Sequence, residues 1–223
     1  MQSKTQLGAR LKYVAMTPRG PRPFHQCLRF FLFGARDVWF VVGVPVFMYT
    51  VLGWSFVGIG TFMALWVIGY GFVQATAPKL FLRSRDSAHK GPGGRAAVCW
   101  ALLLAPVPAA IAIAIELGFS PTVCLVGGLA AFGVVFAINS ALHSYLILAL
   151  ADYDKVAMNV GFYYMANAGG RLTGTVLSGW MYQQHGLAGC LWCSALFILA
   201  TAVLSLKLPG YSTGDAQPGT ESG

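Results

Sequence analysis

Six long apolar stretches, separated by polar or turn-forming segments, dominate the hydrophobic pattern of this chain. They cover residues 33–52, 58–77, 96–115, 122 to about 146, 156–182 and 187–206. A helix needs about 20 residues to cross the roughly 30 Å hydrocarbon layer of a bilayer, so each stretch is long enough to span it. The pattern predicts an all-α integral membrane protein with a six-helix transmembrane bundle.

The segments outside these stretches predict three regions along the chain. Residues 1–29 are basic and proline-rich and are interpreted as a linker-like cytoplasmic segment. Residues 30–208 form the six-span bundle, and residues 209–223 form a disordered cytoplasmic tail. The connections near Trp54, Gly118 and Gly186 are only a few residues long. Successive spans are therefore expected to pack as antiparallel neighbours.

Composition and charge fit this class of protein. Hydrophobic residues make up 57% of the chain and charged residues 10%, against about 25% charged in a typical soluble domain. Thirteen of the 15 Lys and Arg residues lie in segments that would share one side of a membrane crossed six times: Lys4, Arg10, Lys12, Arg19, Arg22, Arg29, Lys79, Arg83, Arg85, Lys90, Arg95, Lys155 and Lys207. Because Lys and Arg are retained on the cytoplasmic side, both termini are predicted to be cytoplasmic.

Several function classes are disfavoured. The net charge of +8 comes from cations in short connections beside apolar spans, so it does not predict nucleic-acid binding. The chain contains no G-x-S-x-G, H-E-x-x-H or Walker-type motif, so we do not expect an enzyme. Cys190 and Cys193 have redox-like spacing but lie inside an apolar span with no second ligand pair. No metal and no cofactor are expected.

The fifth span carries the sharpest functional candidate, Arg171, close to its centre. Asn159, Tyr163, Asn167 and Arg171 recur every four residues and therefore share one helix face. A charge at the centre of a membrane helix costs about 2.5 to 3.5 kcal/mol on insertion scales, so it requires a partner or a water-filled cavity. Two interpretations remain open: the face lines a cavity, or Arg171 is a structural cation paired to Asp37.

Polar residues in the fourth and first spans extend this set. Asn139 and His143 lie one turn apart in the fourth span, and each can form either a solute contact or a hydrogen bond between helices. Arg36 either lines the cavity or extends to the cytoplasmic surface. If transport is proton-coupled, Asp37 and His143 are the available carriers.

A cavity lined by Arg, Asn, Tyr and His suits a small oxyanion that a guanidinium can bind bidentately. The predicted substrate-binding set is Arg171, Asn167, Tyr163, Asn159, His143, Asn139 and Arg36. Small and bent positions, Gly170 with Gly174 and Pro45, Pro106 and Pro108, are expected to shape the helices rather than to bind solute.

Four strings carry a resemblance to a known family. They are FLFGARDVWF from Phe31, LWVIGYG from Leu65, NSALHSYL from Asn139 and NVGFYYMANAGGRL from Asn159. Over residues 29–208 the chain resembles the C-terminal half of organoarsenical efflux permeases of the major facilitator superfamily, the ArsJ type. The resemblance implies a fold like one half of such a transporter, placed in the bacterial inner membrane. It also implies export of 1-arseno-3-phosphoglycerate, the product that glyceraldehyde-3-phosphate dehydrogenase forms from arsenate, and hence arsenate resistance.

The chain departs from this family in length, because a full facilitator has two six-helix halves with the solute site between them. Three explanations stay open: a separately encoded N-terminal half, self-association with a second copy, or a truncated remnant. The alternative function is a polytopic membrane enzyme or a non-transporting assembly subunit.

Overall fold

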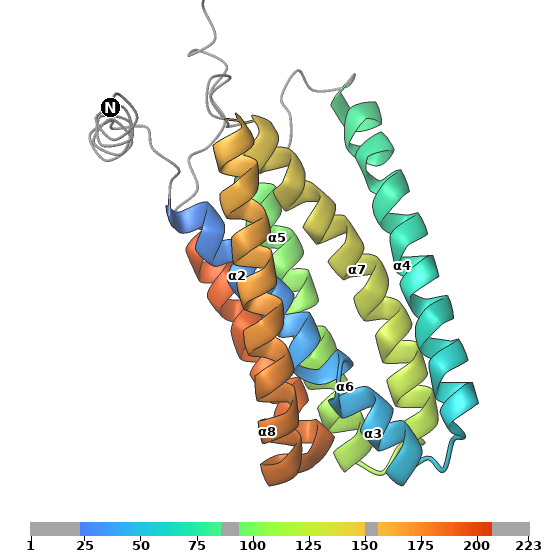
Figure 1. Ribbon diagram of the computed structural model, residues 1–223. Coiled ribbons are helices and arrows are strands. Elements are labelled where there is room, and N and C mark those ends of the chain that lie inside the picture. Colours follow the sequence, from blue (N-terminus) through green and yellow to red (C-terminus); the bar gives the residue numbers. More distant parts are fainter. Residues whose placement is uncertain (1–22, 86–93, 150–155, 207–223) are drawn as a thin grey trace, which may run out of the picture.

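The computed structural model describes residues 23–85, 94–149 and 156–206, and these segments are helical with no strand. The expected all-α class is confirmed for this part of the chain. In chain order the helices are α2 (Pro23–Phe40), α3 (Gly43–Thr50), α4 (Phe56–Arg85), α5 (Gly94–Leu104), α6 (Pro106–Glu116), α7 (Pro121–Ala149) and α8 (Val156–Ser205). Figure 1 shows them as a bundle of roughly aligned helices, with α4 at one edge.

Five helical segments are long and apolar enough to cross a membrane: Cys27–Thr50, Phe56–Ala77, Ala96–Glu116, Pro121–Leu142 and Tyr164–Ser205. The last of these has 42 residues and contains a non-helical residue, Gly186. At that residue α8 reverses direction, so residues 156–185 and 187–205 form two antiparallel arms (Figure 1). We call them the first and second arms of α8. The segment count is therefore five, and the expected six is reached only if each arm crosses separately.

Three glycines make the chain reversals at one end of the bundle. Gly53, Gly118 and Gly186 have φ angles of 69°, 84° and 62°. This left-handed region disfavours residues with a Cβ, so glycine is the residue that allows these tight reversals. Each lies in one of the short connections expected from the sequence. The described ends of α2, α4, α5, α7 and the second arm of α8 lie toward the opposite end (Figure 1).

Proline explains the two interruptions inside the apolar segments. Proline lacks an N–H and its ring clashes with the carbonyl four residues earlier, which is Val41 for Pro45 and Leu104 for Pro108. The break between α2 and α3 falls at Val41, and α5 ends at Leu104. At the first break, the Gly43 N–H donates to Ser178 Oγ of α8 over 3.1 Å, so the group freed by the interruption is satisfied.

Pro78 behaves differently, because α4 continues past it to Arg85. Helix α4 therefore extends eight residues beyond the apolar stretch that ends at residue 77.

The closest helix contact is the crossing of α2 and α8. A Cβ added at Gly170 would overlap the carbonyl oxygen of Phe30, and one added at Gly174 would lie 2.7 Å from the carbonyl oxygen of Gly34. The two α8 glycines, one turn apart, therefore let the two backbones touch, as small residues do in membrane helices. The second arm of α8 is tied to the same helix, because Ser194 Oγ donates to the Ala35 carbonyl over 2.7 Å.

Helix α4 is attached much more loosely. It packs on α7 and touches α3, and its Trp66 Nε1 donates to the Leu129 carbonyl over 2.8 Å. In an 18-residue apolar stretch of Phe56–Ala77 only 6% of the residues are buried, against 61% in such a stretch of Cys27–Thr50. More than half of the residues from Phe56 to Ala77 are exposed, so this part of α4 is open to lipid or to another protein.

Candidate functional site

Three charged residues meet where α2 crosses the first arm of α8. Arg36 Nε lies 2.6 Å from Asp37 Oδ1, and Arg171 Nε lies 3.1 Å from Asp37 Oδ2. Each carboxylate oxygen therefore accepts a bond from a different guanidinium. We call Arg36, Asp37 and Arg171 the Asp37 cluster; it contains two cations and one anion, and so carries a local charge of +1.

The glycine crossing places this cluster. A Cβ at Gly174 would lie 3.1 Å from the Cβ of Asp37, so the absence of a side chain there brings the carboxylate against α8. Arg171, three residues before Gly174, then reaches Asp37 from the neighbouring turn. Adjacent residues on a helix point about 100° apart, yet Arg36 still reaches Asp37 because its long side chain bends back through Nε.

The two arginines have different surroundings. The Arg36 side chain is 12% exposed, and its guanidinium carbon lies 5.5 Å from the ring centre of Phe33 and 5.6 Å from that of Phe136. It is thus held by Asp37 and two aromatic faces. Arg171 is 59% exposed, and among the described residues its terminal nitrogens make no hydrogen bond. The guanidinium of Arg36 is therefore held in place, whereas that of Arg171 has an exposed edge.

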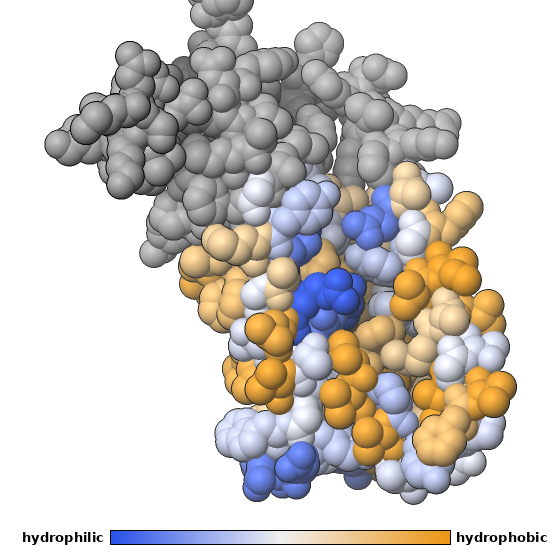
Figure 2. Space-filling model, viewed as in Figure 1, coloured by the Kyte–Doolittle hydropathy of each residue, from blue (hydrophilic) through white to orange (hydrophobic). Residues whose placement is uncertain are grey.

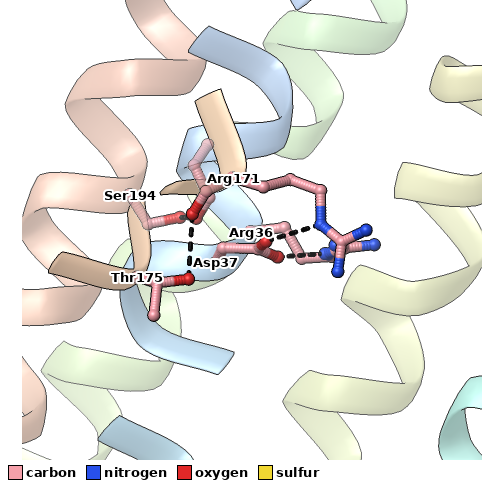
Figure 3. Close-up of polar contacts among 6 residues, drawn as sticks. Arg36, Asp37, Arg171, Thr175 and Ser194 are labelled. Atoms are coloured by element: carbon pink, nitrogen blue, oxygen red, sulfur yellow. Dashed lines mark hydrogen bonds and ion pairs between the residues drawn. The ribbon is translucent and has the colours of Figure 1, made fainter. Parts of the chain in front are cut away.

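The cluster lies about midway along the helices that carry it. Arg36 and Asp37 fall near the middle of the Cys27–Thr50 segment, and Arg171 falls about midway along the first arm of α8. Figure 3 shows both guanidinium groups extending past Asp37 to the same side, toward α7. In the same region Figure 2 shows a compact hydrophilic patch flanked by hydrophobic residues. The surface therefore offers a cationic group about midway along two apolar segments.

The structure bears on one of the two open interpretations of Arg171, and the cavity of the other interpretation stays a prediction. Arg171 is paired to Asp37, as the structural interpretation expected. It is not sealed by that pairing, because more than half of its side chain is exposed. Pairing through Nε orients the guanidinium and leaves its other edge available, which is the edge that binds an oxyanion bidentately.

Asn167 lies one turn before Arg171 on the same arm. Its Oδ1 is buried and has no hydrogen-bond partner among the described residues. A buried amide without a partner is uncommon, and a bound solute or water group would satisfy it. Rotation of the amide exchanges its oxygen and nitrogen, so it can also donate to an anion. Asn139, also in the predicted set, is fully buried on α7.

For three predicted residues the structure gives the position in a helix but not the side chain. His143 lies on α7 and Asn159 and Tyr163 lie on α8, and their side chains lie outside the described part of the structure. Their roles as substrate contacts stay predictions. The proposed proton carriers Asp37 and His143 likewise stay predictions, with Asp37 engaged by both arginines.

A further cation, Arg29, was grouped with the cytoplasmic positive charges and is instead fully buried. Its Nη1 donates to Ser140 Oγ over 3.4 Å and its Nη2 to the Ser140 carbonyl over 3.3 Å, with a further bond to Ser144 Oγ. Its guanidinium also lies 5.3 Å from the Phe33 ring centre. The sequence held a signal for this, because positions 29, 33 and 36 share one helical face and Pro23 suits the first position of a helix. Arg29 thus bonds α2 to α7.

The cysteine pair has a packing role. Cys190 is buried and its thiol donates to the Ser178 carbonyl over 3.5 Å. Among the described residues, no group of three or more His, Cys, Asp or Glu side chains is placed to hold a metal ion.

Comparison with known proteins adds no identification to this geometry. No protein-family model and no curated protein matches the chain.

Proposed function

We propose that this chain provides one six-helix half of a membrane permease that exports an anionic organoarsenical, 1-arseno-3-phosphoglycerate, and so confers arsenate resistance. The observation that carries the proposal is the exposed edge of Arg171, which lies about midway along the first arm of α8. The Asp37 cluster keeps a net charge of +1, which is costly inside a membrane span and so favours a negatively charged passenger there.

The chemistry of the cluster supports an oxyanion. Arsenate and phosphate groups are hard, tetrahedral oxyanions, and a planar guanidinium binds two of their oxygens with two parallel N–H bonds. Asp37 and the Phe33 and Phe136 rings hold Arg36, and Asp37 holds Arg171 through Nε. The binding edge is therefore oriented before the solute arrives, which lowers the entropic cost of binding. Thiolate ligation is disfavoured, because pentavalent arsenic in an arsenate ester is not a soft, thiol-seeking centre.

The membrane topology is part of the proposal. The two arms of α8 are proposed to cross separately, which gives six spans with the strings of the resembled permease family on the first, second, fourth and fifth. The bias of Lys and Arg supports cytoplasmic termini in a bacterial inner membrane.

Arsenate resistance tests this proposal directly. Cells without arsenate export, expressing the dehydrogenase and this chain, are expected to survive arsenate only when a complete transporter forms. The chain is therefore supplied alone and with a separate N-terminal half. Arg171→Ala is expected to remove resistance at normal membrane levels, and Arg171→Lys to retain part of it, since Lys keeps the charge but not the bidentate edge.

The matched control is Leu172→Ala, because Leu172 is the next residue on the same helix and is 68% exposed without a polar role. It is expected to leave resistance unchanged. Absence of resistance in every combination would refute the proposal, and full resistance with Arg171→Ala would return Arg171 to a structural role.

A further inference from the structure

We infer that the partner completing this site is a second copy of the same chain in the same orientation. In the pair, the face around Arg171 meets its symmetry mate, and the two Asp37 clusters bind the two ends of a solute that has an oxyanion group at each end. The inference rests on the proposed function and names the partner for the same site.

The first arm of α8 has two distinct exposed faces. At about 100° per residue, Tyr164, Ala168 and Thr175 lie within about 60° of Arg171, and all of them are at least partly exposed. Farther round, at about 100° to 180°, lies a bulky apolar face: Met165, Leu172, Val176 and Trp180, each 57% to 68% exposed. The apolar face suits lipid. The face with Arg171 carries a cation and polar or short side chains, and it suits another protein.

Lipid is a poor cover for the Arg171 face. A charged side chain near the bilayer centre costs about 2.5 to 3.5 kcal/mol, and the cluster keeps a charge of +1 after Asp37 is counted. Ala168 and Thr175 on this face are short enough for a second backbone to approach closely. A protein partner that shields the cation and leaves room for a solute is therefore favoured.

A second copy fits the symmetry of such a site. The Lys and Arg bias predicts one insertion orientation, so two copies lie parallel in the membrane. A two-fold axis along the membrane normal then brings the same face of each copy together, as in most homodimers. The same relation joins the two halves of a complete facilitator.

The combined charge of two facing clusters favours a solute that both copies bind. Two clusters facing each other carry a combined charge of +2, so an empty pair repels itself. A solute with an oxyanion at each end supplies the missing negative charge, and its two ends match the two-fold pair of guanidinium edges. 1-Arseno-3-phosphoglycerate, with arsenate at one end of three carbons and phosphate at the other, has this form.

Disulfide cross-linking tests the interface. In a full-length chain whose five native cysteines are replaced by alanine, Ala168→Cys is expected to form a covalent dimer on oxidation in membranes. Val203→Cys, 60% exposed on the second arm of α8, is the control and is expected to stay monomeric. Added 3-phosphoglycerate, the stable arsenic-free probe, is expected to raise cross-linking at least about twofold, because it neutralises the facing cations.

Mixed expression gives an independent readout. Equal amounts of wild-type chain and Arg171→Ala are made together, at the same total amount as in cells with wild-type chain alone. Random pairing then leaves about one dimer in four fully wild type. Arsenate efflux is therefore expected to fall about fourfold relative to wild type alone, whereas a site within one copy predicts at most a twofold fall. Leu172→Ala expressed in the same way should leave efflux unchanged.

The outcomes separate the two proposals. A monomeric Ala168→Cys protein, with efflux that needs a separate half and shows no dominant effect, would overturn the second copy and keep the permease. Cross-linking at Ala168→Cys without arsenate resistance or any response to 3-phosphoglycerate would refute the proposed function and the shared solute, and leave only a self-contact.

Discussion

Two neighbouring apolar segments of similar length differ strongly in how far they are buried in this bundle. In an 18-residue apolar stretch of Cys27–Thr50, a segment formed by α2 and α3, 61% of the residues are buried, against 6% in such a stretch of Phe56–Ala77 in α4. The buried segment holds Arg29, Arg36 and Asp37, and the exposed one holds no charged residue. Charges inside a membrane protein require partners from other helices, so they mark the helix that the others surround. Apolar length alone identifies a span and does not tell how deeply it is packed.

The crossing of α2 and α8 is the tightest contact of the buried segment. Gly170→Ala in this crossing is expected to have the largest effect on stability. The added methyl would overlap the Phe30 backbone, which cannot move as a side chain does, so we expect a loss of about 3 kcal/mol or more. Unfolding by denaturant in detergent micelles, followed by helical circular dichroism, measures it. Gly179→Ala on the same arm has open space around the new methyl and should cost nothing. Equal stability of the two variants would show that the crossing is not tight.

Removing the shared carboxylate is expected to have the next largest effect. Asp37→Asn keeps the side-chain volume but leaves two guanidinium groups without an anion, one of them mostly buried. Breaking a buried ion pair costs about 3 to 5 kcal/mol, and the exposure of Arg171 to solvent lowers our expectation to about 2 kcal/mol. The same unfolding measurement checks it. An unchanged midpoint would show that Asp37 does not hold the two arginines together.

The smallest effect is expected on α4. Leu65→Ala removes a side chain that is 63% exposed, so no cavity forms and the change should stay within about 0.5 kcal/mol. Leu32→Ala on α2 removes a fully buried side chain of the same type and should cost about 2 kcal/mol or more. If Leu65→Ala costs as much as Leu32→Ala in detergent, the side chain of Leu65 is buried under those conditions and α4 is not the loosely packed helix described here.

Much of the architecture follows from local chemistry. The apolar stretches predict the helices, Gly53, Gly118 and Gly186 make the expected reversals, and Pro45 coincides with an interruption in the first span. These features depend on residues near one another in the sequence. The continuation of α4 through Pro78 to Arg85 did not follow from the apolar stretch, which ends at residue 77.

The site was less predictable, since it depends on contacts between distant residues. The four-residue spacing around Arg171 and the presence of Asp37 suggested a pair, and the structure joins them. The burial of Arg29 against Ser140 was missed, because its position before the apolar stretch resembles that of a flanking cytoplasmic cation. The aromatic support of Arg36 by Phe136 also could not be found without knowing that α2 approaches α7.

The central claim is that the open edge of Arg171 holds a passing oxyanion, and uptake into everted membrane vesicles tests it most directly. Vesicles that contain the chain and any partner it needs are given the dehydrogenase, glyceraldehyde-3-phosphate with a radiolabelled phosphate group, and arsenate in place of inorganic phosphate. Wild-type vesicles are predicted to accumulate label only when arsenate is present, and Arg171→Ala vesicles with equal protein are predicted to accumulate none. Equal accumulation by the two would contradict the account.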